Sequence, residues 1–248
     1  MDTANFDLKQ LKIFKDEVTR FMMAYKFALD EIDTKIDILK QEFEYIHEYS
    51  PIEHVSSRLK TPESILNKVY RKKYPLTLSG IKENIRDIAG VRITCSFLSD
   101  IYKISDMLHR QKDLHVVEIK DYISHPKPNG YRSLHLLVQI PVFMSDREDH
   151  VYVEIQIRTI AMDFWASLEH KIFYKYNKEV PERLIKELKE AAESATALDK
   201  KMETIHQEVS DIKAKDEQDH IIPLTINNEK LSLPVGFLET IFDKSSLK

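Results

Sequence analysis

The sequence predicts an α/β protein of the α+β type, in which helices cover one face of a sheet and charged side chains line the other. Three segments alternate between apolar and polar residues, as strands with one buried face do. In residues 151–158 every odd position is valine or isoleucine, and the even positions include Glu154 and Arg158. Residues 91–95 and 134–140 repeat the design. Near both ends of the chain, apolar residues recur instead at helical spacing.

The first part of the chain is expected to be helical. Apolar residues recur every three or four positions through residues 6–48, which predicts one long helix, and Pro51 ends it. A second helix is expected to begin at Pro62, with Thr61 as its N-cap. A short helix over residues 79–87 then leads into the first of the three alternating strands.

Helices and strands continue to alternate in the middle of the chain. The pattern predicts a helix over residues 101–110 and a further strand over residues 115–121. Loops over residues 124–130 and 145–149 separate the remaining strands. A helix over residues 164–176 closes this part of the chain.

Pro181 opens the longest regular feature of the sequence. Apolar residues step by three and four without a break from Leu184 to Ile212, which amounts to about four heptads. Two interpretations remain open: the helix packs on its own domain, or it pairs with a helix of another subunit. Its length favours the second, an oligomer. The tail from Asp216 contains prolines and short apolar pieces, and it supports no assignment.

The composition excludes several classes of protein. The chain has 248 residues with 42% hydrophobic content, enough for a packed core, and its net charge of −4 offers no basic field for nucleic acid. The single cysteine, Cys95, excludes an internal disulfide and indicates a reducing compartment, which we expect to be the cytoplasm. The N-terminus is polar and no apolar run approaches about 18 residues, so neither a signal peptide nor a membrane span is expected. The four glycines cannot form a Gly-rich phosphate loop, so any phosphate must be bound by side chains.

Two clusters in the first part of the chain could carry chemistry. The first combines cations with a hydroxyl and consists of Arg58, Lys60, Ser64, Lys68, Arg71 and Lys72. It could bind a triphosphate, although taken alone a solvated basic helix face explains it more simply. The second is Asp87, which precedes a strand and could hold Mg²⁺ through oxygen, or could equally be a turn aspartate. Gly90 is expected to let the backbone turn tightly beside it.

Two further clusters follow. In the loop, Asn129 and Gly130 are expected to form a turn beside Lys127 and Arg132, which suit phosphates, and Tyr131, whose ring suits a base. A decorated hairpin loop is the simpler alternative. The fourth cluster comprises Glu154, Gln156, Arg158, Asp163, Glu169 and His170. Because its strand looks central, Glu154 is the best candidate for a general base or metal ligand. The ten histidines show no zinc-ligand spacing.

Taken together, these clusters resemble the RelA/SpoT-type (p)ppGpp synthetases. Four motifs occur in the order of that family: Arg58-x-Lys60-x3-Ser64-x3-Lys68, the run from Asp87 to Arg92, the run from Gly130 to His135, and the run from Glu154 to Thr159. The resemblance covers roughly residues 50–178. The flanking helices resemble those of the stand-alone small alarmone synthetases, particularly the RelP-like branch.

The resemblance implies a fold and a reaction. The fold would be a mixed, mainly antiparallel sheet related to nucleotidyltransferases. The reaction would be a kinase-type transfer of the pyrophosphate of ATP to the 3′-hydroxyl of GDP or GTP, with Mg²⁺ as cofactor, in stringent-response signalling. Asp87 and Glu154 would be the catalytic, metal-binding pair, and Glu154 would also take the proton of the 3′-hydroxyl.

The resemblance also implies binding residues for both substrates. Arg58 and Arg92 would hold the adenine between their guanidinium planes. The ATP phosphates would be bound by Lys60, Ser64 and Lys68. The acceptor would be bound by Tyr131, stacked on the guanine, and by Lys127, His135, Gln156, Arg158 and His170.

Asp163 is added to the acceptor site on chemical grounds. A carboxylate can accept hydrogen bonds from both guanine N1–H and the guanine amino group, which adenine cannot offer in that arrangement. If Asp163 faces the base, it would help to specify guanine.

The chain departs from the long members of the family. Those carry a His/Asp metal-dependent hydrolase domain before the synthetase and regulatory domains after it, whereas no His-Asp dyad is found here. We therefore expect synthesis without hydrolysis. The single domain would comprise an N-terminal helix (1–50), the synthetase core (51–178), a long helix that supports oligomerisation (179–215) and a tail (216–248). By resemblance the assembly would be a homotetramer.

Three alternatives remain. A nucleotidyltransferase that moves a nucleoside monophosphate would share the sheet and the carboxylate pair. A nucleic-acid-binding module could use the basic clusters, although the negative net charge weighs against it. A purely structural protein would explain the long heptad seam but not the polar strand faces.

Overall fold

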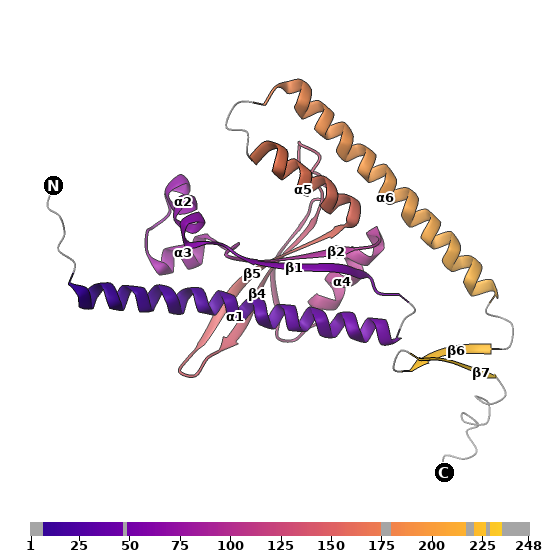
Figure 1. Ribbon diagram of the computed structural model, residues 1–248, viewed down its shortest axis with the longest axis horizontal. Helices are drawn as coiled ribbons and strands as arrows, with labels where there is room; N and C mark the ends of the chain where they lie inside the picture. The colour runs from indigo at the N-terminus through magenta and orange to yellow at the C-terminus, as the bar shows by residue number, and fades with distance from the viewer. Residues whose placement is uncertain (1–6, 47–48, 175–179, 217–220, 227–228, 235–248) are drawn as a thin grey trace, which may run out of the picture.

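The computed structural model describes residues 7–46, 49–174, 180–216, 221–226 and 229–234. These ranges contain a five-stranded mixed sheet with helices around it, which confirms the predicted fold class (Figure 1). Its strands lie in the order β1-β2-β5-β4-β3, with β2 and β5 parallel and the other neighbours antiparallel. The strands are β1 (Ile52–Leu59), β2 (Ala89–Cys95), β3 (His115–Asp121), β4 (Leu134–Phe143) and β5 (Glu148–Thr159).

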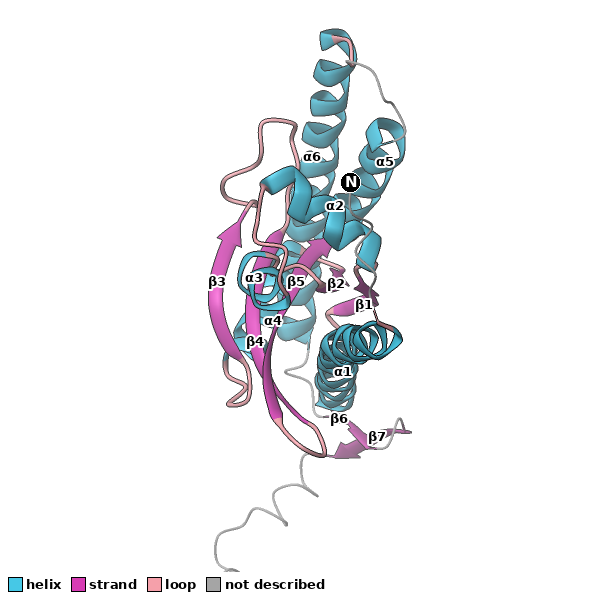
Figure 2. Ribbon diagram, turned by 90° about the vertical axis from the view of Figure 1, so that its left-hand side faces the viewer, coloured by secondary structure: helices cyan, strands magenta, loops and turns pink. Residues whose placement is uncertain are grey.

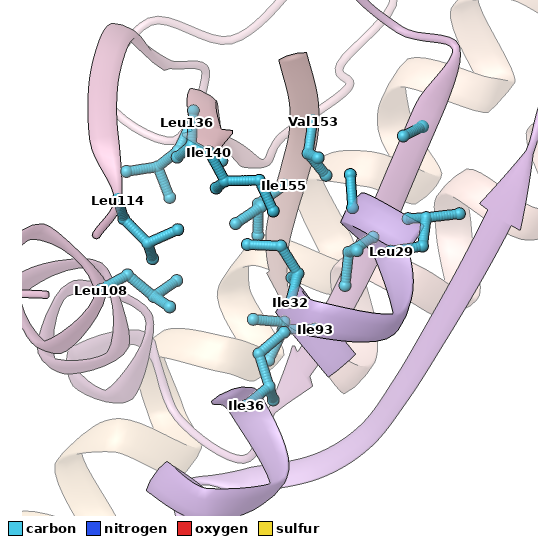
Figure 3. Packing of buried hydrophobic residues seen from close by; sticks show 14 of the residues in the cluster. Leu29, Ile32, Ile36, Ile93, Leu108, Leu114, Leu136, Ile140, Val153 and Ile155 are labelled. Carbon is cyan, nitrogen blue, oxygen red and sulfur yellow. The ribbon is translucent and has the colours of Figure 1, made fainter. Parts of the chain in front are cut away.

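Two helices pack on the apolar face of the sheet. Helix α1 (Leu8–Ile46) contacts β1, β2, β4 and β5, and α4 (Leu98–His109) contacts β2 and β5. Ile32 of α1, Ile93 of β2 and Ile155 of β5 are fully buried and meet in this core (Figure 3). Burial of each such side chain contributes about 1.5–3 kcal/mol. The alternation of the strands therefore decides which face of the sheet is covered.

The remaining helices connect and follow the strands. Helices α2 (Pro62–Lys72) and α3 (Leu78–Asn84) join β1 to β2, while α5 (Ile160–Tyr174) and α6 (Glu182–Asp216) follow β5. In both views α5 and α6 lie together and away from α1 (Figures 1 and 2). Within the ranges that the structure describes, no helix combines the length and the apolar character needed to cross a membrane.

The predicted alternation is confirmed in β5. The valines and isoleucines at odd positions from Val151 to Ile157 are at most 1% exposed. Glu154 and Gln156 open on the other face. Arg158 differs because it is only 7% exposed. Its burial is explained by the hydrogen-bond network of the site.

The start of α2 agrees with the predicted one, whereas other helix ends differ from the prediction. The Thr61 hydroxyl accepts a hydrogen bond from the Ser64 backbone N–H at 3.2 Å, and Pro62 is the first residue of α2. Helix α3 ends at Asn84, ahead of the predicted end at residue 87, so Asp87 lies in the turn before β2. Helix α5 begins earlier than predicted, and residues 175–176 lie outside the described residues.

Three features differ from the predictions or were not predicted. Strand β1 was not recognised as a strand, although Arg58 was considered in an extended segment. The tail contains a hairpin of β6 (Ile221–Ile226) and β7 (Glu229–Pro234). The tight turn predicted at Gly90 is wrong, because Gly90 lies within β2 and has no positive φ. A Cβ at Gly90 would lie 3.7 Å from the Arg58 side chain, so the missing side chain leaves space beside Arg58.

Helix α6 carries two neighbouring stripes. Ala192 and Asp199 face inward and are 5% and 8% exposed. Leu198, Met202 and Val209, from the predicted seam, are 55%, 44% and 46% exposed. This part of the seam lies beside the packed stripe, not on it. Its use as a subunit interface stays a prediction.

Candidate active site

The polar face of the sheet holds two hollows that meet at Glu154. The larger, of about 430 Å³, is bordered by β1, β2 and α5, and the smaller, of about 210 Å³, by β3, β4 and α2. Glu154 lines both hollows. Because β5 is the middle strand of the sheet, its side chains can reach both sides. The site can therefore hold two ligands against one carboxylate.

Strand register aligns polar residues across the whole sheet. Pairing places in one row, from β1 to β3, Ser56, Arg92, Gln156, His135 and Lys120. Residues directly opposite one another point to the same face of a sheet. Arg92, Gln156 and His135 were predicted from the sequence, whereas the two edge residues were not.

Asp87 is held between two lysines. Lys60 Nζ donates to one carboxylate oxygen at 2.5 Å, and Lys68 Nζ donates to the other at 2.8 Å. Lys60 directly follows β1, and Lys68 projects from the helix that begins two residues later. Burial alone would raise the pKa of Asp87, but the hydrogen bonds from both lysines lower it below its ordinary value. The carboxylate is therefore ionised at neutral pH.

The structure brings only part of the first basic cluster to the site. Lys68 lines the smaller hollow, and Arg58 lines the larger one. Ser64 lies exposed in the first turn of α2. Arg71 and Lys72 are exposed in the last turn of that helix, where a solvated face explains them.

Two hydrogen-bonded chains connect Arg158 to Glu154. In the shorter chain, Arg158 Nη2 donates to Gln156 Oε1 at 2.5 Å, and Gln156 Nε2 donates to Glu154 Oε2 at 2.8 Å. In the longer chain, Arg158 Nη2 donates to the Tyr131 hydroxyl at 2.7 Å, and this hydroxyl lies 2.8 Å from His135 Nε2. His135 Nδ1 lies 3.5 Å from Glu154 Oε1. Each carboxylate oxygen of Glu154 is thus linked to Arg158 through one of these two chains.

This arrangement keeps Glu154 charged. Burial alone would raise the pKa of Glu154, but hydrogen bonds from His135 and Gln156 lower it below its ordinary value. The Tyr131 hydroxyl can donate to His135 Nε2, which leaves the imidazole proton on Nδ1, facing Glu154. An ionised carboxylate at this position can accept a proton or bind a cation.

Asp163 joins Arg92 and Arg158, two of the three arginines that line the larger hollow. Its Oδ1 accepts from Arg92 Nη1 at 2.8 Å and from Arg158 Nη1 at 3.1 Å. A buried guanidinium without a partner is strongly destabilising, so Asp163 supports Arg158. It also fixes Arg92 at the edge of the hollow. Recognition of guanine by Asp163 stays a prediction, and the contact that the structure shows is with the two arginines.

The loop before β4 forms a closed turn. Gly130 N donates to the Lys127 carbonyl at 2.8 Å, and Lys127 N donates to the Tyr131 carbonyl at 3.1 Å. Gly130 has φ +90°, as the predicted Asn-Gly turn requires. Lys127 Nζ lies 4.6 Å and 4.7 Å from the ring centroids of Tyr122 and Tyr131. The loop presents a cation and an aromatic ring together, while His170 lines the larger hollow from α5.

Sequence reasoning missed several lining residues. The smaller hollow is also lined by Asn84, Glu118 and Lys120, and the larger by Ser56, Ser167 and Lys171. Two signals could have identified some of them. Glu118 and Lys120 alternate with Ile119, as polar residues do on the other strands. Ser167 and Lys171 follow Asp163 at spacings of four, which places them on one face of α5.

Asp87 and Glu154 fit a divalent cation. Both line the smaller hollow, and the pKa of each is lowered. Carboxylate oxygens are hard donors, which suit Mg²⁺ better than softer metals. The chemistry of the donor set therefore agrees with the magnesium site expected from the sequence.

Comparison with known proteins defines the family. The model described as "Region found in RelA / SpoT proteins" matches residues 57–179. This span contains every predicted site residue. The chain belongs to the RelA/SpoT family, as the sequence resemblance indicated. GTP pyrophosphokinase YwaC from Bacillus subtilis strain 168 is 54% identical over 209 residues, which are 84% of this chain and 100% of YwaC.

Two solved structures of small alarmone synthetase 1 from Bacillus subtilis share the fold. The structure bound to its product pppGpp matches with a TM-score of 0.72 at 43% identity, and the match covers 78% of this chain and 98% of that chain. The structure bound to AMPCPP matches with a TM-score of 0.67 at 41% identity, and the match covers 79% of this chain and 99% of that chain. The predicted fold family is confirmed.

Proposed function

We propose that this protein is a GTP pyrophosphokinase that transfers the β,γ-pyrophosphate of ATP to the 3′-hydroxyl of GDP or GTP. The observation that carries the proposal is the pair of hollows that share Glu154. A reaction between two nucleotides needs two adjacent sites and a base where they meet. Membership in the RelA/SpoT family supports the same activity. The chain acts as a synthetase without hydrolase activity.

The ATP side is assigned to the part of the larger hollow along β1 and β2, and to α2, which borders the smaller hollow. Arg58 and Arg92 line the larger hollow, and Asp163 fixes Arg92 through an ion pair. Planar guanidinium groups can stack on both faces of an adenine ring. Lys60, Lys68 and the Ser64 hydroxyl bind the phosphates.

The acceptor side is assigned to the loop before β4 and to the polar row of the sheet. Tyr131 stacks on the guanine, and Lys127 contacts acceptor phosphates from the same loop. The neighbouring polar groups that complete the site are His135, Gln156, Arg158, Asp163 and His170. Arg158 orders Tyr131 and Gln156 together, because it donates to both.

Transfer begins when Glu154 accepts the proton of the acceptor 3′-hydroxyl. The 3′-oxygen then forms a bond to the β-phosphorus of ATP, and the bond from that phosphorus to the α–β bridging oxygen breaks, which releases AMP. Asp87 and Glu154 would hold Mg²⁺, which would neutralise charge on the transferred group. Lys60 and Lys68 place two further positive charges beside Asp87. The hydrogen bonds from Gln156 and His135 keep Glu154 oriented between the substrates.

The assembly is proposed to be a homotetramer in the cytoplasm. The exposed stripe of α6 supports the oligomer, since an isolated helix rarely leaves so many large apolar residues in water. The buried single cysteine supports a reducing compartment. Light scattering on the full chain and on Leu198→Lys tests the assembly. An oligomer of the same mass in both would remove the stripe as an interface.

The function is tested by incubation of the purified protein with γ-labelled ATP, Mg²⁺ and GDP or GTP. We expect label in a guanosine tetra- or pentaphosphate, together with AMP, and loss of transfer in Glu154→Gln. Glu148→Gln is the matched control, because Glu148 lies exposed at the start of the same strand. Release of pyrophosphate, with a nucleoside monophosphate attached to the acceptor, would instead indicate nucleotidyl transfer. Absence of any transfer by folded protein would refute the proposal.

A further inference from the structure

Helix α6 touches the loop that carries Lys127 and Tyr131. A Cβ placed on Gly130 would lie 2.6 Å from the Ala192 Cβ of α6, closer than two such atoms can approach. It would also lie 3.7 Å from the Lys189 Cα. This approach requires a glycine in the loop and a small residue on the helix. The loop and the helix therefore pack without space for an additional carbon atom at Gly130.

Tyr131 takes part in the same contact. Trp165 and Ala166 of α5 form a small buried cluster with Ala192 of α6, and Tyr131 packs against this cluster. Trp165 Nε1 donates to the Leu188 carbonyl at 3.0 Å, which fastens α6 to α5. The Tyr131 ring, which is proposed to stack on the guanine, is thus held partly by α6.

A polar contact sets the position of α6 relative to the sheet. The Thr159 hydroxyl at the end of β5 donates to Asp199 Oδ2 at 2.7 Å, and both residues are buried. Such a bond is worth more in a buried setting than at the surface, because neither group has water as an alternative partner. Thr159 directly follows Arg158, so α6 is tied to the strand end that organises the site.

We propose that the inner face of α6 positions the acceptor loop, with Ala192 as a positioning residue for the guanine nucleotide. This inference rests on the proposed function and deepens it, because it names the element on which acceptor binding depends. The ATP side has its main support elsewhere, since β1 and β2 pack on α1, and α6 is linked to Arg92 only indirectly, through α5 and its Asp163. A displacement of α6 therefore changes the use of the acceptor and leaves the use of ATP in place.

The first test compares Ala192→Leu with Ala197→Leu. Both changes add the same atoms to the same helix, but Ala197 is exposed and Ala192 is buried. The larger side chain at position 192 must push the loop or the helix away. We expect the KM for GDP to rise about tenfold, with the KM for ATP within about twofold and both unchanged in Ala197→Leu. Equal changes in the two KM values, or none in folded Ala192→Leu, would overturn the inference.

A second readout does not depend on turnover. Trp165 is the single tryptophan of the chain and lies in the contact cluster, so its emission reports on this junction. Titration with GDP should change the emission, and the Kd should be about tenfold weaker in Ala192→Leu. A protein that binds GDP but transfers nothing would refute the proposed function, and a weaker Kd in Ala192→Leu would still support this inference. An unchanged Kd in Ala192→Leu would refute the inference alone.

A third comparison covers the case in which Ala192→Leu does not fold. Gly130→Ala introduces the 2.6 Å contact and strains the positive φ of the turn. Combining it with Ala192→Gly removes the contact but not the strain. Part of the loss in GDP binding should therefore return in the double variant, measured against Ala192→Gly alone. No recovery would show that the helix does not press on the loop.

Discussion

Replacement of Arg158 by lysine tests the central network of the site. The change keeps the positive charge and replaces a forked guanidinium by a single ammonium group. Arg158 donates through Nε to Ser133 at 3.4 Å and through Nη1 to Asp163 at 3.1 Å. Through Nη2 it donates to Tyr131 at 2.7 Å and to Gln156 at 2.5 Å. A lysine at this position can reach about two of these acceptors at once.

The expected loss follows from the bonds that lysine cannot make. Hydrogen bonds to a charged group contribute about 1.5–3 kcal/mol each when buried. The Asp163 side chain is 26% exposed, so solvent screening reduces its share. We expect Arg158→Lys to lose about 2–4 kcal/mol of unfolding free energy, which corresponds to a fall in Tm of roughly 5–15 °C. The kcat should fall at least about tenfold, because both chains to Glu154 begin at Arg158.

Thermal unfolding at one fixed protein concentration and steady-state kinetics measure these effects. Arg147→Lys is the control, since Arg147 donates to Asp149 at 2.9 Å near the turn between β4 and β5, away from both hollows. It should change neither quantity measurably. If Arg158→Lys matched the parent protein in both Tm and kcat, the network would not organise Glu154, and the reasoning would be wrong.

Three further predictions concern single positions. Gly90→Val should raise the KM for ATP at least about tenfold, because the new side chain enters the hollow beside Arg58. The KM for GDP should stay within about twofold of its parent value. Equal effects on both substrates would contradict the assignment of the ATP side. The pKa of Asp87 is lowered from 3.8, so its ion pairs stabilise the fold above that pH and are lost as the pH falls through the lowered value. The urea midpoint of Asp87→Asn should thus lie below that of the parent near pH 7, with a difference that shrinks as the pH falls below 3.8. A difference independent of pH would argue against the two-lysine site. Burial raises the pKa of the Cys95 thiol, so a thiol reagent should modify it only after unfolding, and rapid modification of folded protein would show that β2 opens.

The core could be predicted because its signal is local and repeated. In β5 each apolar residue is separated from the next by one polar residue, so a single face had to be buried. The same reasoning applies to α1, whose apolar residues recur at helical spacing over many turns. Such patterns give the type of an element without any knowledge of its neighbours.

Strand β1 could not be predicted in this way. Among its residues only Ile52 is fully buried, and the others are half-buried or exposed. It lies at the edge of the sheet, where backbone hydrogen bonds to β2 hold it without help from a clear apolar face. Its formation therefore depends on a partner strand more than thirty residues further along the chain.

The residue types of the site were also predictable, since two carboxylates and several cations occur in fixed order around the three alternating strands. Their roles in the network were not. Arg158 looked like a cleft residue of the alternating strand, yet it is buried because four acceptors from β5, α5 and the loop before β4 surround it. Lys120 and Lys171 come from β3 and α5, and neither lies in a motif.

The sequence by itself determined the strands that bury one face, the two long helices and the chemical groups available for transfer between nucleotides, because each of these depends on local spacing or residue type. Only the tertiary structure decided that the strand order places Glu154 between two hollows and that Lys60 and Lys68 meet at Asp87. It also decided that α6 packs on the turn at Gly130. These relations join residues far apart in the chain, and they depend on register and packing, which no single segment encodes.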